Sequence, residues 1–199
     1  MHKRIFTSIA ATLLFVSMSA QVSPGDNAID FTLQNVDGAS VSLSDYADAK
    51  GVILVFTCNP CPFSKAYEQR IIRLHKTFSK IGYPVIAINP NDTGVSPDDS
   101  MDEMKKRASE KNYPFPYLKD ESGIYKKYGA TRTPHVFLLQ NRERGKFSVA
   151  YIGAIDNNAM DEKAVTEKYV ENAIRALESG TKPAPSTVKA IGCTIKTRS

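Results

Sequence analysis

An apolar stretch that ends in two closely spaced cysteines constrains this chain more than any other feature. Residues 51–57 form a continuous β-branched and aromatic run, and Cys58 and Cys61 follow it. Such a run predicts a buried strand. Pro62 suits the first turn of a helix, because the N–H that proline lacks has no partner there. A helix N-terminus stabilises a thiolate, so we expect the Cys58 sulfur there and Cys61 one turn away, close enough to close a disulfide.

The residues after Pro62 predict an amphipathic helix followed by a second strand. Apolar side chains recur along one helical face; they are Phe63, Tyr67, Ile71, Leu74 and Phe78. Gly82 is a typical terminator, and the apolar residues 85–88 predict a second buried strand. Strand, helix and strand in this order imply a parallel pair with a right-handed crossover.

The rest of the chain completes one α/β domain, which suits a length of 199 residues. The expected elements are an N-terminal β-hairpin over 30–43, a helix from Ser96 to about Lys111, an extended segment at 113–118, a short helix at 121–128, an antiparallel pair at 135–139 and 147–152, and a final helix at 161–179. Helix caps, turn residues and apolar periodicity carry these expectations.

The first twenty residues predict an export signal. His2, Lys3 and Arg4 give a positive start, the next fourteen residues are mostly apolar, and small residues precede Gln21. The apolar run is short for a membrane span, although an uncleaved anchor is the alternative. We expect a signal peptide at 1–20, a folded domain at 21–180 and an irregular tail at 181–199 packed on or near that domain. The mature protein is then periplasmic or otherwise extracytoplasmic, where disulfides persist, with no stable membrane insertion.

Charge and composition argue against nucleic-acid and structural-metal functions. The net charge of +5 is mild, and basic residues alternate with acids rather than forming a stripe interleaved with aromatics. Structural zinc needs a second ligand pair, but the chain has one further cysteine, and His2, His75 and His135 form no spaced pair. We therefore expect neither a nucleic-acid partner nor a bound cofactor.

A second signal is Pro134, which directly precedes an apolar strand more than seventy residues after Cys61. A strand, a C-x-x-C pair and a helix in this order favour a thioredoxin-like fold, and that fold places a cis proline at this point beside the active site. An ordinary residue at the start of a strand is the alternative. We expect the cis form, which would leave the Thr133 backbone free to pair with an incoming chain while the ring shields the sulfurs from metals.

Four segments together resemble the exported thioredoxin-like redoxin family, which is often grouped with alkyl hydroperoxide reductase and thiol-specific antioxidant proteins. The segments are 58–68, 87–92, 128–135 and 153–156. The resemblance extends from about Pro24 through the tail. It implies a thioredoxin-like fold with a central mixed sheet, an N-terminal β-hairpin extension and a helical insertion, with Cys58 and Cys61 as the redox pair and Pro134 as the cis proline.

The expected activity is thiol–disulfide exchange, with catalytic roles for Cys58, Cys61 and Pro134. Cys58 attacks a substrate disulfide as a thiolate, and Cys61 resolves the mixed disulfide. We expect substrate contacts at Asn59, Pro60 and Thr133. The expected partners are protein disulfides or dithiols and a redox partner that the sequence does not identify, with the direction of electron flow left open.

Two departures from related families bear on mechanism. Typical peroxiredoxins place a threonine three residues before the peroxide-attacking cysteine, where this chain has Val55. Thioredoxin keeps a buried acid six residues before its first cysteine, where this chain has Val52, and no proton shuttle is evident in its place. Lys65 and Glu68, on the helix after Cys61, are expected to be solvated surface charges.

Two other functions compete with this one. One is a thiol peroxidase of the peroxiredoxin-like type that uses the same pair of cysteines. The other is a copper-binding thioredoxin-like chaperone that holds copper through Cys58, Cys61 and His135, because soft thiolates select copper. Such chaperones separate their cysteines by three residues, whereas two intervene here, and His135 is expected to be a residue at the start of a strand.

The third cysteine, Cys193, leaves three interpretations open. It can be a buried small residue, a regulatory third thiol or an intermolecular link. We favour the buried residue.

Overall fold

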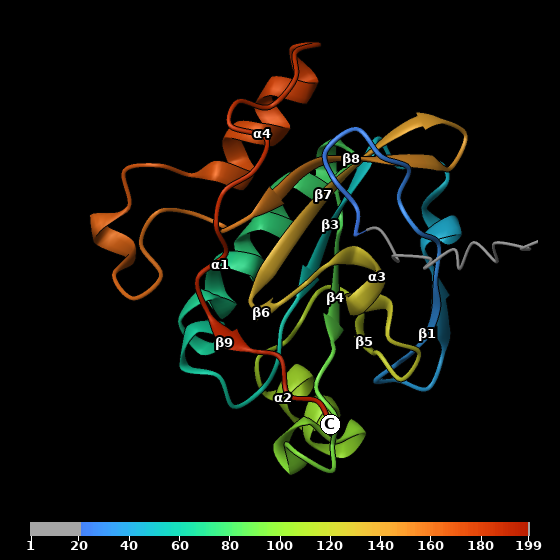
Figure 1. Cartoon of the computed structure of the whole chain (residues 1–199), viewed down its shortest axis with the longest axis vertical. Helices are drawn as coiled ribbons and strands as arrows, with labels where there is room; N and C mark the ends of the chain where they lie inside the picture. Colours follow the sequence, from blue (N-terminus) through green and yellow to red (C-terminus); the bar gives the residue numbers. More distant parts are fainter. Residues whose placement is uncertain (1–20, 199) are drawn as a thin grey trace, which may run out of the picture.

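A seven-stranded mixed sheet forms the centre of the protein, in the order β2-β1-β5-β4-β3-β7-β8 (Figure 1). The computed structural model describes residues 21–198, so the predicted signal segment lies outside the described residues. The strands are β1 (Thr32–Asn35), β2 (Ser40–Ser42), β3 (Gly51–Phe56), β4 (Val85–Asn89), β5 (Tyr117–Lys119), β6 (Arg132–Thr133), β7 (His135–Glu143), β8 (Lys146–Gly153) and β9 (Cys193–Thr194). The α-helices are α1 (Pro62–Phe78), α2 (Met101–Glu110), α3 (Ile124–Tyr128) and α4 (Tyr169–Glu178).

The pairing of the strands follows the predicted architecture. β3 is parallel to β4, and β4 is parallel to β5, whereas β7 is antiparallel to β3 and to β8. The N-terminal hairpin of β1 and β2 joins the sheet because β1 pairs antiparallel with β5. The predicted mixed sheet, hairpin extension and helical insertion, which contains α2, are therefore confirmed.

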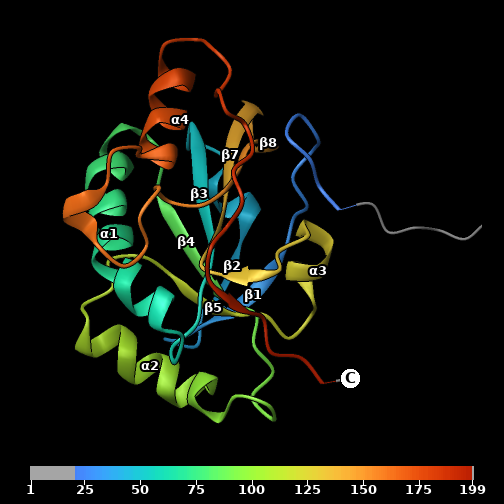
Figure 2. The ribbon, with the colours of Figure 1, turned by 60° about the vertical axis from the view of Figure 1, so that its left-hand side comes forward.

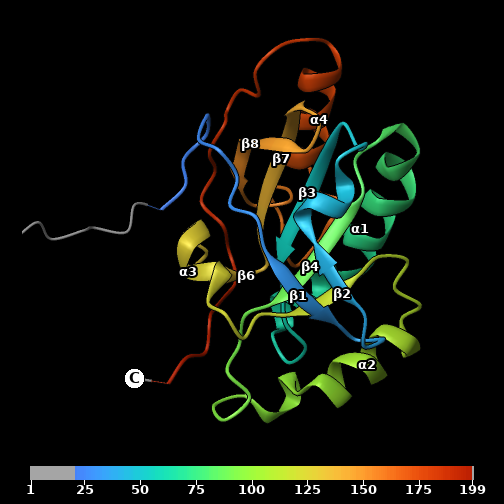
Figure 3. The ribbon, with the colours of Figure 1, turned by 90° about the vertical axis from the view of Figure 1, so that its right-hand side faces the viewer.

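Helices cover both faces of the sheet, which explains why β3 is buried along its whole length. Ile53 and Val55 pack into an apolar cluster with α1 and α4, while Leu54 and Phe56 pack on the other side with α3 and the N-terminal segment. Figure 3 shows α1 and α3 on opposite sides of β3 and β4. Within residues 21–198, no helix is long and apolar enough to cross a membrane.

A buried ion pair fixes α1 against the loop after β8. Arg70 Nη1 lies 2.6 Å from Asp156 Oδ2, and both side chains are less than a tenth exposed. Tyr67 donates its hydroxyl hydrogen to Asp156 Oδ1 over 3.0 Å, and Arg70 also donates to the carbonyl groups of Asn158 and Ala159. These bonds compensate the cost of burying both charges.

Three helices, α2, α3 and α4, begin later than the sequence predicts, and α3 does so at Ile124 rather than at residue 121. The insertion has a short 3₁₀ turn at Pro97–Asp99, and α2 starts at Met101 with Ser100 as its N-cap rather than Ser96. The last helix starts at Tyr169 rather than Asp161, because Asn157 bonds the backbone of Thr166 and Glu167 and holds those residues in a loop. At the last helix, side-chain bonds from a residue outside the helix overcame the local helical pattern.

The chain after α4 returns along the sheet to the cysteine loop. Figure 2 shows this segment running from α4 down past β8 to β9. Thr187 forms a parallel bridge with Ile152, and Val188 donates its N–H to the Ile152 carbonyl. Further on, β9 pairs antiparallel with β6.

The buried ion pair gives a stability prediction. Asp156→Ala should lower the free energy of unfolding by about 3–5 kcal/mol, because it leaves the Arg70 guanidinium buried without its counter-charge. Glu162→Ala is the matched control: it removes an acid that pairs with Arg73 of the same helix, but both partners are more than half exposed, so the loss should be about 0–1 kcal/mol. Urea denaturation measures both, and equal losses would contradict the role given to Asp156.

Candidate functional site

Three sulfur atoms meet where β3 ends and α1 begins. The structure joins Cys61 to Cys193 in a disulfide with Cα atoms 6.1 Å apart, across 132 residues of sequence, and leaves Cys58 as a buried thiol. The interpretation of Cys193 as a merely buried residue is therefore wrong. In this form Cys61 is bonded to the tail rather than to its neighbour Cys58.

Thr133 contacts both cysteines of the C-x-x-C motif. Its side chain is fully buried, its Oγ1 lies 3.1 Å from Cys58 Sγ, and its carbonyl oxygen lies 3.3 Å from Cys61 Sγ. The peptide bond from Thr133 to Pro134 is cis, as predicted. β6 thus places one backbone carbonyl and one hydroxyl against two sulfur atoms.

The electrostatic environment of Cys58 differs from the prediction. Burial raises the pKa of the Cys58 thiol, and the charge of Asp99 raises it further. Hydrogen bonds from Thr133, the Cys61 backbone and Ser64 lower the pKa but do not offset burial. Cys61, not Cys58, is the N-cap of α1. The expectation of a stabilised thiolate at Cys58 is therefore wrong for this form of the protein, because desolvation outweighs the donors.

The loop between the cysteines is held from inside by the insertion. The Asn59 backbone N–H donates to Asp99 Oδ1 over 2.8 Å, and its side-chain amide donates to the Asp98 carbonyl over 2.8 Å. Tyr117 donates its hydroxyl hydrogen to Asn59 Oδ1 over 3.0 Å. The side chain of Asn59 is buried and hydrogen-bonded at both its amide nitrogen and its oxygen, so its position favours orienting the loop over contacting a substrate.

Asp99 is a buried acid that the sequence analysis missed. Its carboxylate is inaccessible to solvent and accepts hydrogen bonds from Asn59, Asn89, Asn91 and Ser96. It is close enough to raise the pKa of Cys58. The pattern Ser-Pro-Asp-Asp indicated only a helix start, and the asparagines at 89 and 91 were the one sequence signal that polar groups meet there.

The two charged residues expected on the surface after Cys61 behave differently. Lys65 is exposed, as expected. Glu68 is buried, lies 2.6 Å from the Arg107 guanidinium and accepts a hydrogen bond from the Tyr113 hydroxyl over 2.8 Å. The expectation for Glu68 is wrong because α2 of the insertion packs over this part of α1. A polar groove of about 220 Å³, lined in part by Pro60, Lys65 and Arg107, lies beside the cysteine loop.

His135 is the first residue of β7, as expected for a residue at the start of a strand. Its ring is buried against Phe137, and the Thr131 N–H points to its Nδ1 over 3.5 Å. Burial lowers the pKa of His135 to about 4. Within residues 21–198, no three His, Cys, Asp or Glu side chains are grouped to hold a metal ion. In this form Cys61 is bonded to Cys193, so it offers no free thiolate to the copper alternative through Cys58, Cys61 and His135.

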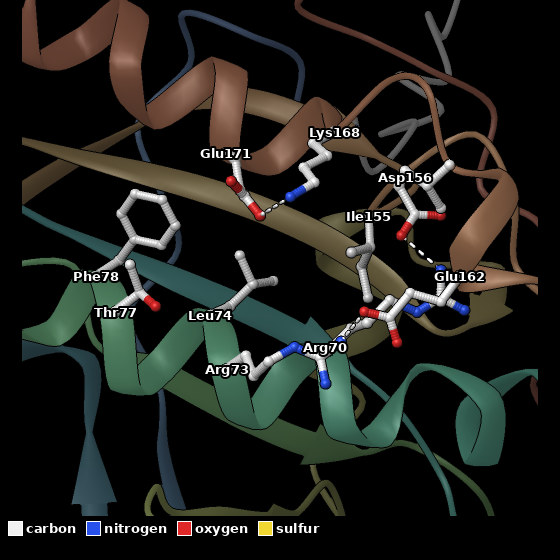
Figure 4. Close-up of a pocket in the computed structure, with 11 residues that line it drawn as sticks. Arg70, Arg73, Leu74, Thr77, Phe78, Ile155, Asp156, Glu162, Lys168 and Glu171 are labelled. Carbon is white, nitrogen blue, oxygen red and sulfur yellow. Dashed lines mark hydrogen bonds and ion pairs between the residues drawn. The ribbon is translucent and has the colours of Figure 1, made fainter.

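A separate cavity of about 300 Å³ lies between α1 and α4 (Figure 4). Three ion pairs surround it, namely Arg70–Asp156, Arg73–Glu162 and Lys168–Glu171. None of the three cysteines lines it. Because its charged groups are already paired with one another, we assign this cavity to the packing of the two helices.

The fold and the sulfur cluster define the class of the protein as a thioredoxin-like redoxin. The chain belongs to the AhpC/TSA family, whose model matches residues 24–156. This match confirms the family expected from the motifs.

The proteins that resemble the chain include a peroxiredoxin and a thiol-disulfide oxidoreductase. Peroxiredoxin Q of Sedum lineare is 26% identical and covers 89% of this chain and 90% of its own length. The thiol-disulfide oxidoreductase ResA of Halalkalibacterium halodurans is 23% identical, and the match covers 69% of this chain and 73% of that protein. An uncharacterized conserved protein from Geobacillus kaustophilus, known from a crystal structure, is 35% identical in sequence. Its structure matches with a TM-score of 0.80, over 89% of this chain and 94% of that chain.

The contact between Thr133 and Cys58 gives a pH prediction. While the Cys61–Cys193 bond is intact, alkylation of Cys58 should accelerate with pH with a midpoint above about 8.5, because burial raises the pKa. Thr133→Val should raise the midpoint further, because it removes a donor to the thiolate. Thr131→Val is the matched control: it makes the same substitution at an exposed threonine and should leave the midpoint unchanged. A midpoint below about 8.5 in the wild type would contradict the burial argument.

Removing the charge of Asp99 should change the pKa of Cys58 in the opposite direction to removing the Thr133 hydroxyl. Asp99→Asn should lower the pKa of Cys58, because it removes a negative charge that raises it. Asp98→Asn is the control, since that neighbouring side chain is exposed and screened by solvent. Mass spectrometry of alkylated protein across pH measures both variants. If both move the midpoint equally, the effect does not come from the buried carboxylate.

Proposed function

We propose that the protein is a thiol–disulfide oxidoreductase in which Cys58 is the nucleophile and Cys61 the resolving cysteine. The observation that carries this proposal is the position of both sulfurs against Thr133, with Cys61 already engaged in a disulfide while Cys58 remains a thiol. A cysteine that forms a disulfide beside a second thiol can exchange it by thiolate attack. Membership of the AhpC/TSA family and the likeness to thiol-disulfide oxidoreductases support it.

The reaction begins from the reduced C-x-x-C pair. The Cys58 thiolate attacks one sulfur of a substrate disulfide, forms a mixed disulfide and releases the first substrate thiolate. The Cys61 thiolate then attacks Cys58 Sγ, which forms the Cys58–Cys61 bond and releases the second substrate thiolate. The substrate gains two electrons, and the pair loses two. Donors from Thr133, Ser64 and the Cys61 backbone stabilise the Cys58 thiolate as it forms and departs.

The surface around the cysteines suits an extended polypeptide. β6 offers a backbone edge beside the cysteines, which β9 occupies here, and an extended chain can pair at such an edge by β-augmentation. Pro60 lines the polar groove at the other side of the cysteine loop. We propose Thr133 and Pro60 as substrate contacts, Pro134 as the residue that shapes this edge, and Asn59 as the residue that positions the loop.

Two further features belong to the proposal. The signal-like residues 1–20 support an extracytoplasmic location, in which protein disulfides are available as substrates. The buried Val55 in the middle of β3 cannot orient a peroxide through a hydroxyl, so we favour exchange over peroxidase activity.

Single substitutions test the assignment. Cys58→Ser should reduce the rate at which the reduced protein cleaves a peptide disulfide by more than about 1,000-fold, because the nucleophile is lost. Cys61→Ser should accumulate a mixed disulfide between Cys58 and the substrate, visible as an added mass. The exposed Ser109→Ala is the control and should keep the wild-type rate.

The same reduced protein distinguishes exchange from peroxidase activity. Stopped-flow mixing with hydrogen peroxide should oxidise it much more slowly than mixing with the peptide disulfide. Full turnover by Cys58→Ser, or faster oxidation by peroxide than by the disulfide, would refute the proposed function.

A further inference from the structure

The tail occupies the edge that the proposed function needs for a substrate. Cys193 pairs in register with Thr133, and Thr194 pairs with Arg132, so β9 forms a two-stranded sheet with β6 (Figure 1). Arg132 Nη1 also donates to Thr194 Oγ1 over 2.7 Å. The cysteine of this strand is the one bonded to Cys61. The tail thus presents a cysteine in an extended segment, which is what a polypeptide substrate would present.

The insertion holds the other side of the same segment. Lys196 donates its N–H to Asn91 Oδ1 over 2.8 Å, and its carbonyl accepts the Asp92 N–H over 2.8 Å. Asn91 in turn donates to Asp99, whose other carboxylate oxygen holds the cysteine loop through Asn59. One buried carboxylate therefore connects the C-x-x-C loop to the segment that covers it.

Gly192 allows this close approach. A Cβ at this position would overlap the Thr133 carbonyl oxygen and come within 3.1 Å of the Pro134 nitrogen. Both obstacles are backbone atoms, which cannot rotate away as a side chain can. A residue with a side chain at 192 is therefore incompatible with the observed pairing of β6 and β9.

We propose that Cys193 is a third redox-active cysteine and that residues 190–196 are a built-in, releasable occupant of the substrate edge. This inference rests on the proposed function. The Cys58 thiolate attacks Cys61 Sγ, the Cys58–Cys61 bond forms, the Cys61–Cys193 bond breaks, and Cys193 leaves as a thiolate that takes a proton. One disulfide is present before and after, so the step needs no external oxidant or reductant. It produces the oxidised C-x-x-C pair and frees the edge of β6 together.

The reverse step closes the edge. Cys193 attacks Cys61, displaces Cys58 as a thiolate and restores the pairing of the tail with Thr133. The structure is the closed form, in which Cys58 is a buried thiol and the edge is covered. The β6 edge is therefore covered when the disulfide joins Cys61 to Cys193, and open when the disulfide joins Cys58 to Cys61.

Peptide mapping of the oxidised full-length chain tests the proposal. Protein oxidised to one disulfide per chain is alkylated in acid-quenched samples and digested with trypsin without reduction. The closed form yields peptide 51–65 linked to peptide 190–196, whereas the open form yields 51–65 with an internal disulfide and alkylated 190–196. Fragmentation before Pro60 shows which cysteine of peptide 51–65 carries the link.

The decisive variant is Gly192→Ala, which keeps all three cysteines. It should shift the ratio of open to closed form by about tenfold or more toward the open form, because the added methyl group overpacks against the Thr133 backbone. The exposed Ile191→Ala is the matched control and should change the ratio less than about twofold. An equal ratio in the two variants would overturn the proposal.

A second measurement guards against a purely local effect of Gly192→Ala. In Cys193→Ser, deuterium uptake by residues 190–196 should be about tenfold faster than in the oxidised wild type, while uptake by α1 stays the same. Unchanged uptake in the tail would also refute the proposal. Failure of the proposed function is distinguishable from failure of this inference. It would appear as full disulfide cleavage by Cys58→Ser, whatever the ratio of open to closed form.

Discussion

One buried residue, Thr133, brings the three cysteines of the chain together. Its hydroxyl contacts Cys58, its carbonyl oxygen contacts Cys61, and its backbone pairs with Cys193. A residue without accessible surface cannot move without disturbing the core around it. The two-residue strand β6 therefore acts as a fixed reference to which the cysteine loop and the tail are both aligned.

The insertion supplies a buried carboxylate, Asp99, together with some of the hydrogen-bond donors that stabilise it. A carboxylate as buried as Asp99 is tolerated only when donors surround it, and four side-chain or backbone groups donate to it here. The cost of burial is thereby offset, and the hydrogen bonds fix the loop that carries Asn59. The insertion is thus part of the framework that holds the cysteine loop rather than a surface addition.

Cys58 illustrates a balance between reactivity and protection. Apolar surroundings favour the neutral thiol, while three donors favour the thiolate. Burial dominates in the form with Cys61 bonded to the tail, so the thiol form of the proposed nucleophile is favoured while the proposed substrate edge is paired with β9.

Local sequence patterns determined the elements whose residues interact with near neighbours. The continuous apolar run of β3, the helical spacing of α1 and the position of Pro134 predicted their structures correctly, because periodicity reports which face of an element is buried. The start of α4 was missed, since Asn157 intervenes from outside the helical pattern. Only the tertiary structure decided the partner of Cys61 and the burial of Asp99 and Glu68. Those properties depend on residues far away in the chain, and no spacing along the sequence records which distant groups meet when a sheet, an insertion and a tail pack together.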